Sequence, residues 1–150
     1  MEGIGMYFVE RKKIEMTLQF IEQLLTEYEK MTVESYQEKL ALERLVQLLI
    51  ESIIDVGNMM IDGFIMRDPG SYEDIIDILE DEKVIPTAES KPYKAVIELR
   101  KMLVKDYLEI NHDKLSEVIN ENYSVLTQFS TRIRVYLDNE IGVANAFTKE

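Results

Sequence analysis

Apolar residues recur along the first part of the chain with the period of an α-helix. Over about residues 10–30 they follow one another at spacings of four, three, four and three, which is the pattern of one amphipathic helix. Those positions are Ile14, Leu18, Ile21, Leu25 and Tyr28. A second and unusually long helix is predicted over about residues 33–63.

The predicted helix over residues 33–63 is apolar around most of its circumference. Its polar residues fall on one narrow face, at Arg44, Gln47, Glu51, Asp55, Asn58 and Asp62. An apolar arc this wide exceeds what one face of a helical bundle covers, so we expect part of it to pack against a second copy of the chain. The pattern leaves open the alternative that this helix is central and enclosed within one monomer.

The middle of the chain is marked by turn residues. Residues 67–70 include a Pro-Gly pair and should end the long helix. Ser71, with Asp74 three residues later, resembles a capping box with aspartate in place of glutamate, and it predicts a short helix through Leu79. Residues 81–92 contain two prolines and are expected to form a connector.

Two further helices are predicted after this connector. The first covers about residues 91–108, and the second starts at Asn111 and ends at Gly142. The core stripe of this last helix is Leu115, Ile119, Leu126, Phe129, Ile133 and Leu137. Residues 142–150 should form a mobile tail. The predicted fold is an all-α, up-and-down bundle of four longer helices and one short one, in a single domain of residues 1–150.

Composition narrows the classes of function. A length of 150 residues with 46% hydrophobic and 31% charged residues is typical of one soluble domain. The formal net charge of −12 opposes binding to nucleic acid or anionic membranes except at a local basic patch. The absence of cysteine excludes disulfides, thiolate nucleophiles and cysteine zinc sites. Because no segment is long and apolar enough to span a membrane, we expect a cytoplasmic protein.

Basic groups, an aromatic hydroxyl and a helix pattern coincide only in residues 97–108. Arg100, Lys101 and Lys105 form a cationic island that could receive a phosphate. On the helix predicted over about residues 91–108, Arg100 and Tyr107 are seven positions apart and lie within about 20° of each other, so they can face the same neighbour. The alternative is a solvated helix face without a ligand.

Other kinds of site find little support in the sequence. The only histidine, His112, stands at a predicted helix start, where a local role is expected. Glu51 and Asp55 are four residues apart on one helix, but the Glu-x-x-His pairs of a two-metal bundle site are missing. There is no glycine-rich phosphate loop and no Ser-His-Asp set. We therefore predict neither a metal nor a cofactor.

Three segments, in this order, resemble one known family. Residues 41–55 look like its long-helix segment, and residues 68–74 like its Pro and Ser-Tyr turn. Residues 100–107 lie where the family has Arg-Asn, two or three apolar residues, and then His-x-Tyr. Over about residues 11–133 the sequence thus resembles the HepT-like proteins, the toxin half of minimal-nucleotidyltransferase/HEPN toxin–antitoxin pairs.

The resemblance implies an α-helical homodimer and, as in many family members, a metal-independent endoribonuclease. It would assign phosphate and transition-state stabilisation to Arg100, and modification with AMP by a partner nucleotidyltransferase antitoxin to Tyr107. The sequence departs from the motif at Lys101, where the family has asparagine, and at Lys105, where it has the catalytic histidine. A lysine with the ordinary pKa of about 10.4 is protonated at pH 7 and cannot act as a base.

Three functions remain open from the sequence. The first is a HepT-like toxin–antitoxin protein whose ribonuclease-type Arg-x4-Lys-x-Tyr site, formed by Arg100, Lys105 and Tyr107, is degenerate or weakly active. The second is a helical bundle that only binds another protein. The third is an active metal-independent endoribonuclease that uses Lys105 or His112. The first two differ in whether Arg100 and Tyr107 line a shared cleft across the dimer or face solvent.

Overall fold

A computed structural model describes the backbone of residues 2–148 and the side chains of residues 11–140. Within residues 2–148 the chain forms six α-helices and one short 3-10 helix, without a strand. They are α1 (Glu2–Lys30), α2 (Tyr36–Gly63), α3 (Tyr72–Asp81), α4 (Thr87–Val104), η1 (Tyr107–Glu109), α5 (His112–Leu126) and α6 (Phe129–Thr148). The predicted all-α bundle is confirmed.

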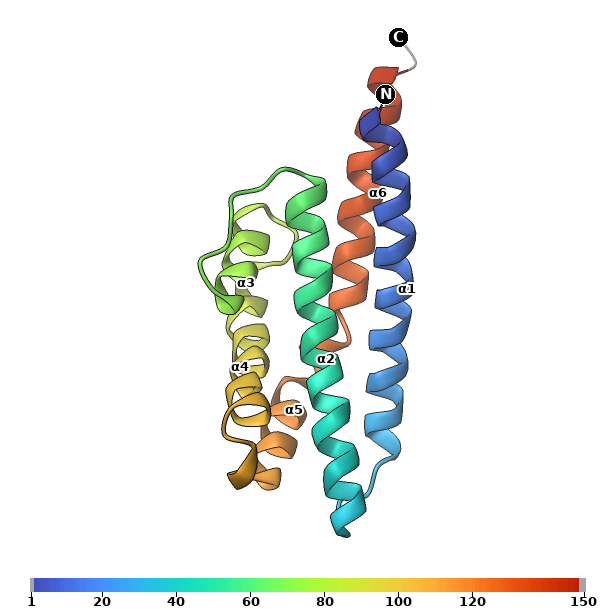
Figure 1. The fold of residues 1–150 in the computed structure, drawn as a ribbon. Helices are drawn as coiled ribbons and strands as arrows, with labels where there is room; N and C mark the ends of the chain where they lie inside the picture. Colours follow the sequence, from blue (N-terminus) through green and yellow to red (C-terminus); the bar gives the residue numbers. More distant parts are fainter. Residues whose placement is uncertain (1, 149–150) are drawn as a thin grey trace.

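Helix α2 is the centre of the bundle. It packs against α1 on one side and against α3, α4 and α5 on the other, while α6 lies beside α1 (Figure 1). The beginning of α1 and the end of α6 lie close together at one end of the molecule (Figure 1).

The first three helices are observed close to their predicted bounds, except that α1 begins at Glu2 instead of about residue 10. Ser35 forms a capping box with Glu38 at the start of α2. The Ser71 hydroxyl accepts a hydrogen bond of 3.1 Å from the Asp74 amide at the start of α3. Polar caps therefore fix where α2 and α3 begin.

The expected connector over residues 81–92 is shorter than predicted, because α4 already begins at Thr87. Pro86 is its N-cap and Pro92 lies inside the helix. A proline there removes only the hydrogen bond to the carbonyl of Ala88, which is exposed and can be hydrated by solvent. The helix ends at Val104 instead of the predicted Leu108.

The single helix predicted over residues 111–142 is in fact two helices. The Thr127 hydroxyl donates a 2.7 Å hydrogen bond to the Ser124 carbonyl, and the Gln128 amide bonds to the Val125 carbonyl, so the α-helical ladder stops there. The break moves the chain from beside α4 to beside α1 (Figure 1).

Helix α6 continues to Thr148, so the predicted helix end at Gly142 is wrong. Residues 149–150 of the predicted tail lie outside the described residues, and the mobility of the tail stays a prediction.

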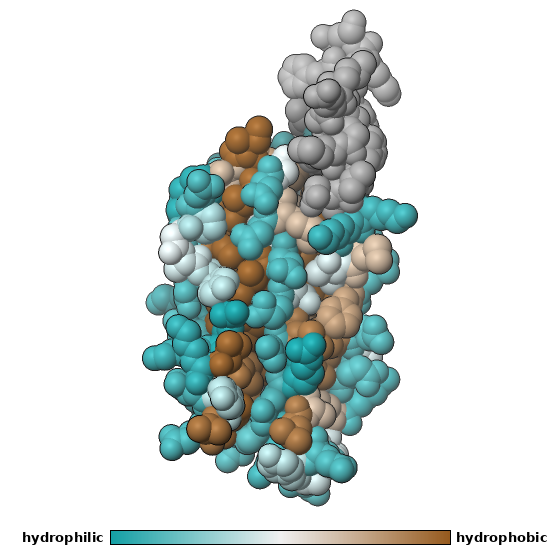
Figure 2. Space-filling view, in the orientation of Figure 1, coloured by the Kyte–Doolittle hydropathy of each residue, from teal (hydrophilic) through white to brown (hydrophobic). Residues whose placement is uncertain are grey.

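The apolar arc of α2 is filled within the monomer. The apolar residues of this arc are at most 9% exposed, except for Leu48, which is half-buried. They are Leu45, Val46, Leu49, Ile50, Ile53, Ile54, Val56, Met59, Met60 and Ile61. The reason given above for a homodimer is therefore wrong, and the enclosed central helix is observed. On the face seen in Figure 2, hydrophobic residues reach the surface as strips among hydrophilic ones.

Helix α3 approaches α2 most closely at Gly57. A Cβ atom at this position would lie 2.3 Å from the Cγ2 atom of Ile75. The missing side chain thus lets α3 lie directly on α2, which brings the turn before α3 close to the polar face of α2.

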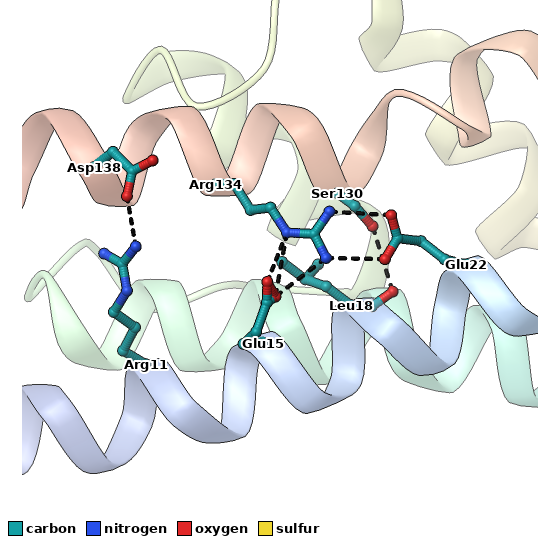
Figure 3. Close-up of polar contacts among 7 residues, drawn as sticks. All are labelled: Arg11, Glu15, Leu18, Glu22, Ser130, Arg134 and Asp138. Carbon is teal, nitrogen blue, oxygen red and sulfur yellow. Dashed lines mark hydrogen bonds and ion pairs between the residues drawn. The ribbon is translucent and has the colours of Figure 1, made fainter.

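Helix α6 is fastened to α1 by a set of polar contacts (Figure 3). The Arg134 guanidinium donates hydrogen bonds of 2.7–3.2 Å to Glu15 and 2.9–3.0 Å to Glu22. Its hydrogen bonds lower the pKa of Glu22. One turn further along α6, Asp138 accepts a 2.5 Å bond from Arg11 (Figure 3). These contacts supplement the buried apolar residues of α6.

Candidate functional site

Arg100 lies just before the last turn of α4 and reaches toward both α2 and α3. Its Nε donates a 2.7 Å hydrogen bond to Oε1 of Glu51 on α2. The guanidinium carbon lies 4.4 Å from the centroid of the Tyr72 ring, at the start of α3. The hydrogen bond to Glu51 raises the pKa of Arg100 above its ordinary value, so the guanidinium stays charged.

This arrangement leaves the outer half of the guanidinium available. Neither terminal nitrogen of Arg100 donates a hydrogen bond to a described residue, and the side chain is 25% exposed. Glu51 fixes one edge of the guanidinium and Tyr72 covers one face, so two parallel N–H donors remain for a ligand. A guanidinium held in this way suits the two oxygens of a phosphate.

The two lysines of the predicted cationic island face solvent. Lys101 and Lys105 are both exposed. Lys105 is the C-cap of α4, and the backbone amides of Lys105 and Asp106 both donate to the Lys101 carbonyl, at 2.9 and 3.1 Å. The helix therefore ends at this point, and its last turn is distorted.

Tyr107 lies beyond the end of α4, in the short helix η1. Its side chain is 63% exposed. The prediction that Arg100 and Tyr107 share one helix face is wrong, because the helix ends three residues before Tyr107. Arg100 lies between α2 and α3, whereas Tyr107 faces solvent.

His112 forms a separate pair with α2. Its Nε2 lies 2.7 Å from Oε2 of Glu43, and both side chains are about three-quarters buried. Glu43 and Glu51 are eight residues apart, which places the two contacts about 12 Å apart along α2. Within one monomer His112 is thus too far from Arg100 to act on the same phosphate, and it fixes the start of α5 against α2.

Sequence reasoning missed the partners of these residues. Glu51 was identified as part of a polar stripe and was considered with Asp55 for a metal site, but not as a partner of Arg100. The two residues are 49 positions apart in the sequence and pair in space. The signal available was that a carboxylate on a mostly apolar helix often has a cationic partner.

The described residues show neither a cluster of metal ligands nor a membrane-spanning helix. Among the described residues, no three histidine, cysteine, aspartate or glutamate side chains gather as metal ligands would. None of the helices within residues 2–148 combines the length and the hydropathy of a membrane span.

Comparison with known proteins identifies relatives along nearly the whole chain. The family model "Ribonuclease HepT-like" matches residues 14–133. A Bacillus subtilis (strain 168) protein named "Putative RNase YutE" is 50% identical over 143 residues, covering 95% of this chain and 99% of its own length. A solved structure of the cytosolic protein YutE from Bacillus subtilis has a TM-score of 0.86 at 49% identity, over 88% of this chain and 93% of that one.

A more distant structure extends the comparison of folds. It is described as a tri-AMPylated Shewanella oneidensis HEPN toxin in complex with MNT antitoxin. It has a TM-score of 0.64 at 21% identity, over 86% of this chain and 96% of that one, and at this identity the likeness shows the fold alone. With the family model spanning most of the bundle and a close relative spanning nearly all of it, this chain belongs to the HepT-like ribonuclease family.

Proposed function

We propose that this protein is a ribonuclease-type toxin of a toxin–antitoxin pair, which binds RNA at Arg100 and cleaves it weakly or not at all. The observation behind this proposal is the fixed guanidinium, held by Glu51 at 2.7 Å and by Tyr72 at 4.4 Å with its outer donors free of described partners. The name of the Bacillus subtilis relative supports RNA as the substrate class.

Metal-independent cleavage of RNA needs three groups. A base removes the proton of the 2′-hydroxyl, an acid protonates the leaving 5′-oxygen, and a cation stabilises the charge that develops on the phosphate. Arg100 supplies the cation. Lys105, at the motif position of the histidine, is exposed to solvent. The Lys105 ammonium makes no hydrogen bond or ion pair with a described residue that would hold it beside a 2′-hydroxyl, so it does not serve as a positioned base.

The test is incubation of the purified protein with a mixed pool of RNA in the presence of EDTA. We expect cleavage at the detection limit, because loss of a positioned acid–base group typically costs a factor of about 10²–10⁴ in rate. Lys91→Ala, which removes an exposed charge from the same helix, is the control for Arg100→Ala. Rapid cleavage that Arg100→Ala abolishes would refute the weak site and favour an active endoribonuclease.

The partner proposed for this toxin is a nucleotidyltransferase antitoxin. The exposed hydroxyl of Tyr107 is accessible for transfer of AMP from ATP, with pyrophosphate leaving. Incubation with the partner enzyme and ATP should add AMP to the wild type and to the control Tyr36→Phe, whose tyrosine is 74% exposed, but not to Tyr107→Phe. Modification that persists in Tyr107→Phe would place the acceptor elsewhere.

A homodimer is part of the same proposal. It is supported by the resemblance to the family and by apolar side chains that remain exposed in the monomer, such as Met16 at 63% and Leu40 at 44%.

A pure protein-interaction bundle remains the second candidate, favoured by the solvent-facing Tyr107 and the 89% exposed Leu108. Loss of RNA binding in Arg100→Ala distinguishes the ribonuclease-type toxin from the interaction bundle, because a protein that only binds other proteins is not expected to bind RNA through Arg100.

A further inference from the structure

An open cavity of about 340 Å³ lies next to the Arg100 site, between the polar face of α2 and the start of α3. It is lined by Asn58 of α2, by residues 69–73 of the turn and first helical residues, and by Ile75. Its volume is in the range of pockets that hold small ligands.

The lining residues offer what a nucleobase needs. The Asn58 side chain is half-buried and makes no hydrogen bond with a described residue, so its amide has both a donor and an acceptor for the edge of a base. Tyr72 supplies a flat aromatic ring on which a base can stack, and Pro69 supplies an apolar ring beside it.

Charge determines which part of a nucleotide fits here. The one charged residue among those lining the cavity is Glu73, and the nearby face of α2 carries Asp55. These carboxylates repel a phosphate but do not oppose a neutral base. A nucleotide is therefore expected to place its base in the cavity and its phosphate at Arg100.

Tyr72 connects the cavity to the phosphate-binding group. Its ring lines the cavity and also lies against the Arg100 guanidinium. On α2, Asn58 follows the Arg100 partner Glu51 by seven residues, which places them about 20° apart around the helix and about 10 Å apart along it. A nucleotide spans a similar length from its phosphate to the far edge of its base.

We propose that this cavity is a nucleobase subsite and that, together with Arg100, it binds one nucleoside monophosphate unit. The proposal rests on the proposed function, since it takes Arg100 as the group that holds the phosphate. The unit can come from a free nucleotide or from a nucleotide within a single RNA strand. Asn58 then determines which base is preferred.

The test measures binding of four RNA oligonucleotides, each made of one kind of base, by fluorescence anisotropy. Binding of the four ribonucleoside 5′-monophosphates is measured by NMR titration. Asn58→Ala removes the amide, and alanine is well tolerated in a helix. Gln47→Ala is the matched control, because Gln47 is another half-buried amide on the same face with no described partner, on the far side of Glu51 from the cavity.

We expect the wild type to prefer one base by about tenfold over the weakest, as an amide–base contact allows. Asn58→Ala should remove this preference, and Gln47→Ala should keep it. The same preference among mononucleotides identifies a free nucleotide as sufficient, whereas a preference confined to oligonucleotides identifies the RNA strand.

Two results overturn the proposal, and they differ in what they leave standing. If RNA binding depends on Arg100 but shows no base preference, or a preference that survives in Asn58→Ala, the subsite is refuted and the proposed function is kept. If no RNA binds, or Arg100→Ala binds RNA as well as the wild type, the proposed function fails together with the subsite.

Discussion

Gly57 is the point at which α3 comes closest to α2, and replacing it with alanine should destabilise the protein. The added Cβ atom would lie 2.3 Å from Cγ2 of Ile75, whereas carbon atoms pack at about 3.5–4.0 Å. Ile75 is only 2% exposed, and its Cγ2 is attached directly to its Cβ, so this atom moves only if the χ1 angle changes or the backbone shifts. Either a strained Ile75 side chain or a shift of α3 away from α2 by about 1 Å is needed to relieve the contact.

Two opposing effects set the size of this change. Overpacking of a core typically costs about 1–3 kcal/mol. Alanine in place of glycine inside a helix returns about 0.5–1 kcal/mol. The middle of these two ranges gives a net loss of unfolding free energy of about 1 kcal/mol for Gly57→Ala, which lowers the melting temperature of a chain of this length by roughly 3 °C.

Gly63 provides the matched control for this substitution. It lies at the end of the same helix, and a Cβ atom there meets nothing within 4 Å. Urea unfolding at equal protein concentrations should show Gly63→Ala at or slightly above the wild-type midpoint and Gly57→Ala clearly below it. A Gly57→Ala variant as stable as the wild type would refute the close approach of α3 and, with it, the position of Tyr72.

Three further predictions concern pH, assembly and catalysis. Hydrogen bonding to Arg67 lowers the pKa of Asp74 to about 2. The ionised Asp74 therefore stabilises the fold above the ordinary carboxyl pKa, and this stabilisation is lost as the pH falls from about 4 toward 2. The unfolding free energy of Asp74→Asn should depend less on pH over this range than that of the wild type. Light scattering at micromolar concentration should report roughly twice the 17.6 kDa chain mass, and a strict monomer would contradict the proposed dimer. Lys101→Asn combined with Lys105→His should gain metal-independent RNA cleavage near neutral pH, and Lys105→His alone should gain less; an inert, folded double variant would argue against a decayed catalyst.

Periodicity of apolar residues was sufficient to predict the first three helices and the all-α class, because the helical period persists over each of them and serine caps mark the starts of α2 and α3. It could not reveal the break between α5 and α6. Leu126 and Phe129 are three residues apart, so the stripe continues in register across the break. It also could not show whether other helices or a second chain cover the apolar arc of α2, since both give the same pattern.

The candidate site was predictable only in part, for a related reason. Arg100 was identified from neighbouring residues in the sequence and from the family motif. Its partners Glu51 and Tyr72 come from other helices, and nothing local in the sequence indicates these contacts. The end of α4 at Val104, which separates Tyr107 from Arg100, depends on how the chain turns toward α5.

The central claim is that the guanidinium held by Glu51 and Tyr72 binds the phosphate of RNA. The most direct test is the affinity for single-stranded RNA, measured over a range of salt concentrations for the wild type, Arg100→Ala and the control Lys91→Ala. We expect Arg100→Ala to bind about tenfold more weakly, with the slope of log affinity against log salt reduced by about 0.7, the value for one lost phosphate contact on a single strand. Equal affinities and equal slopes for all three proteins would contradict the claim.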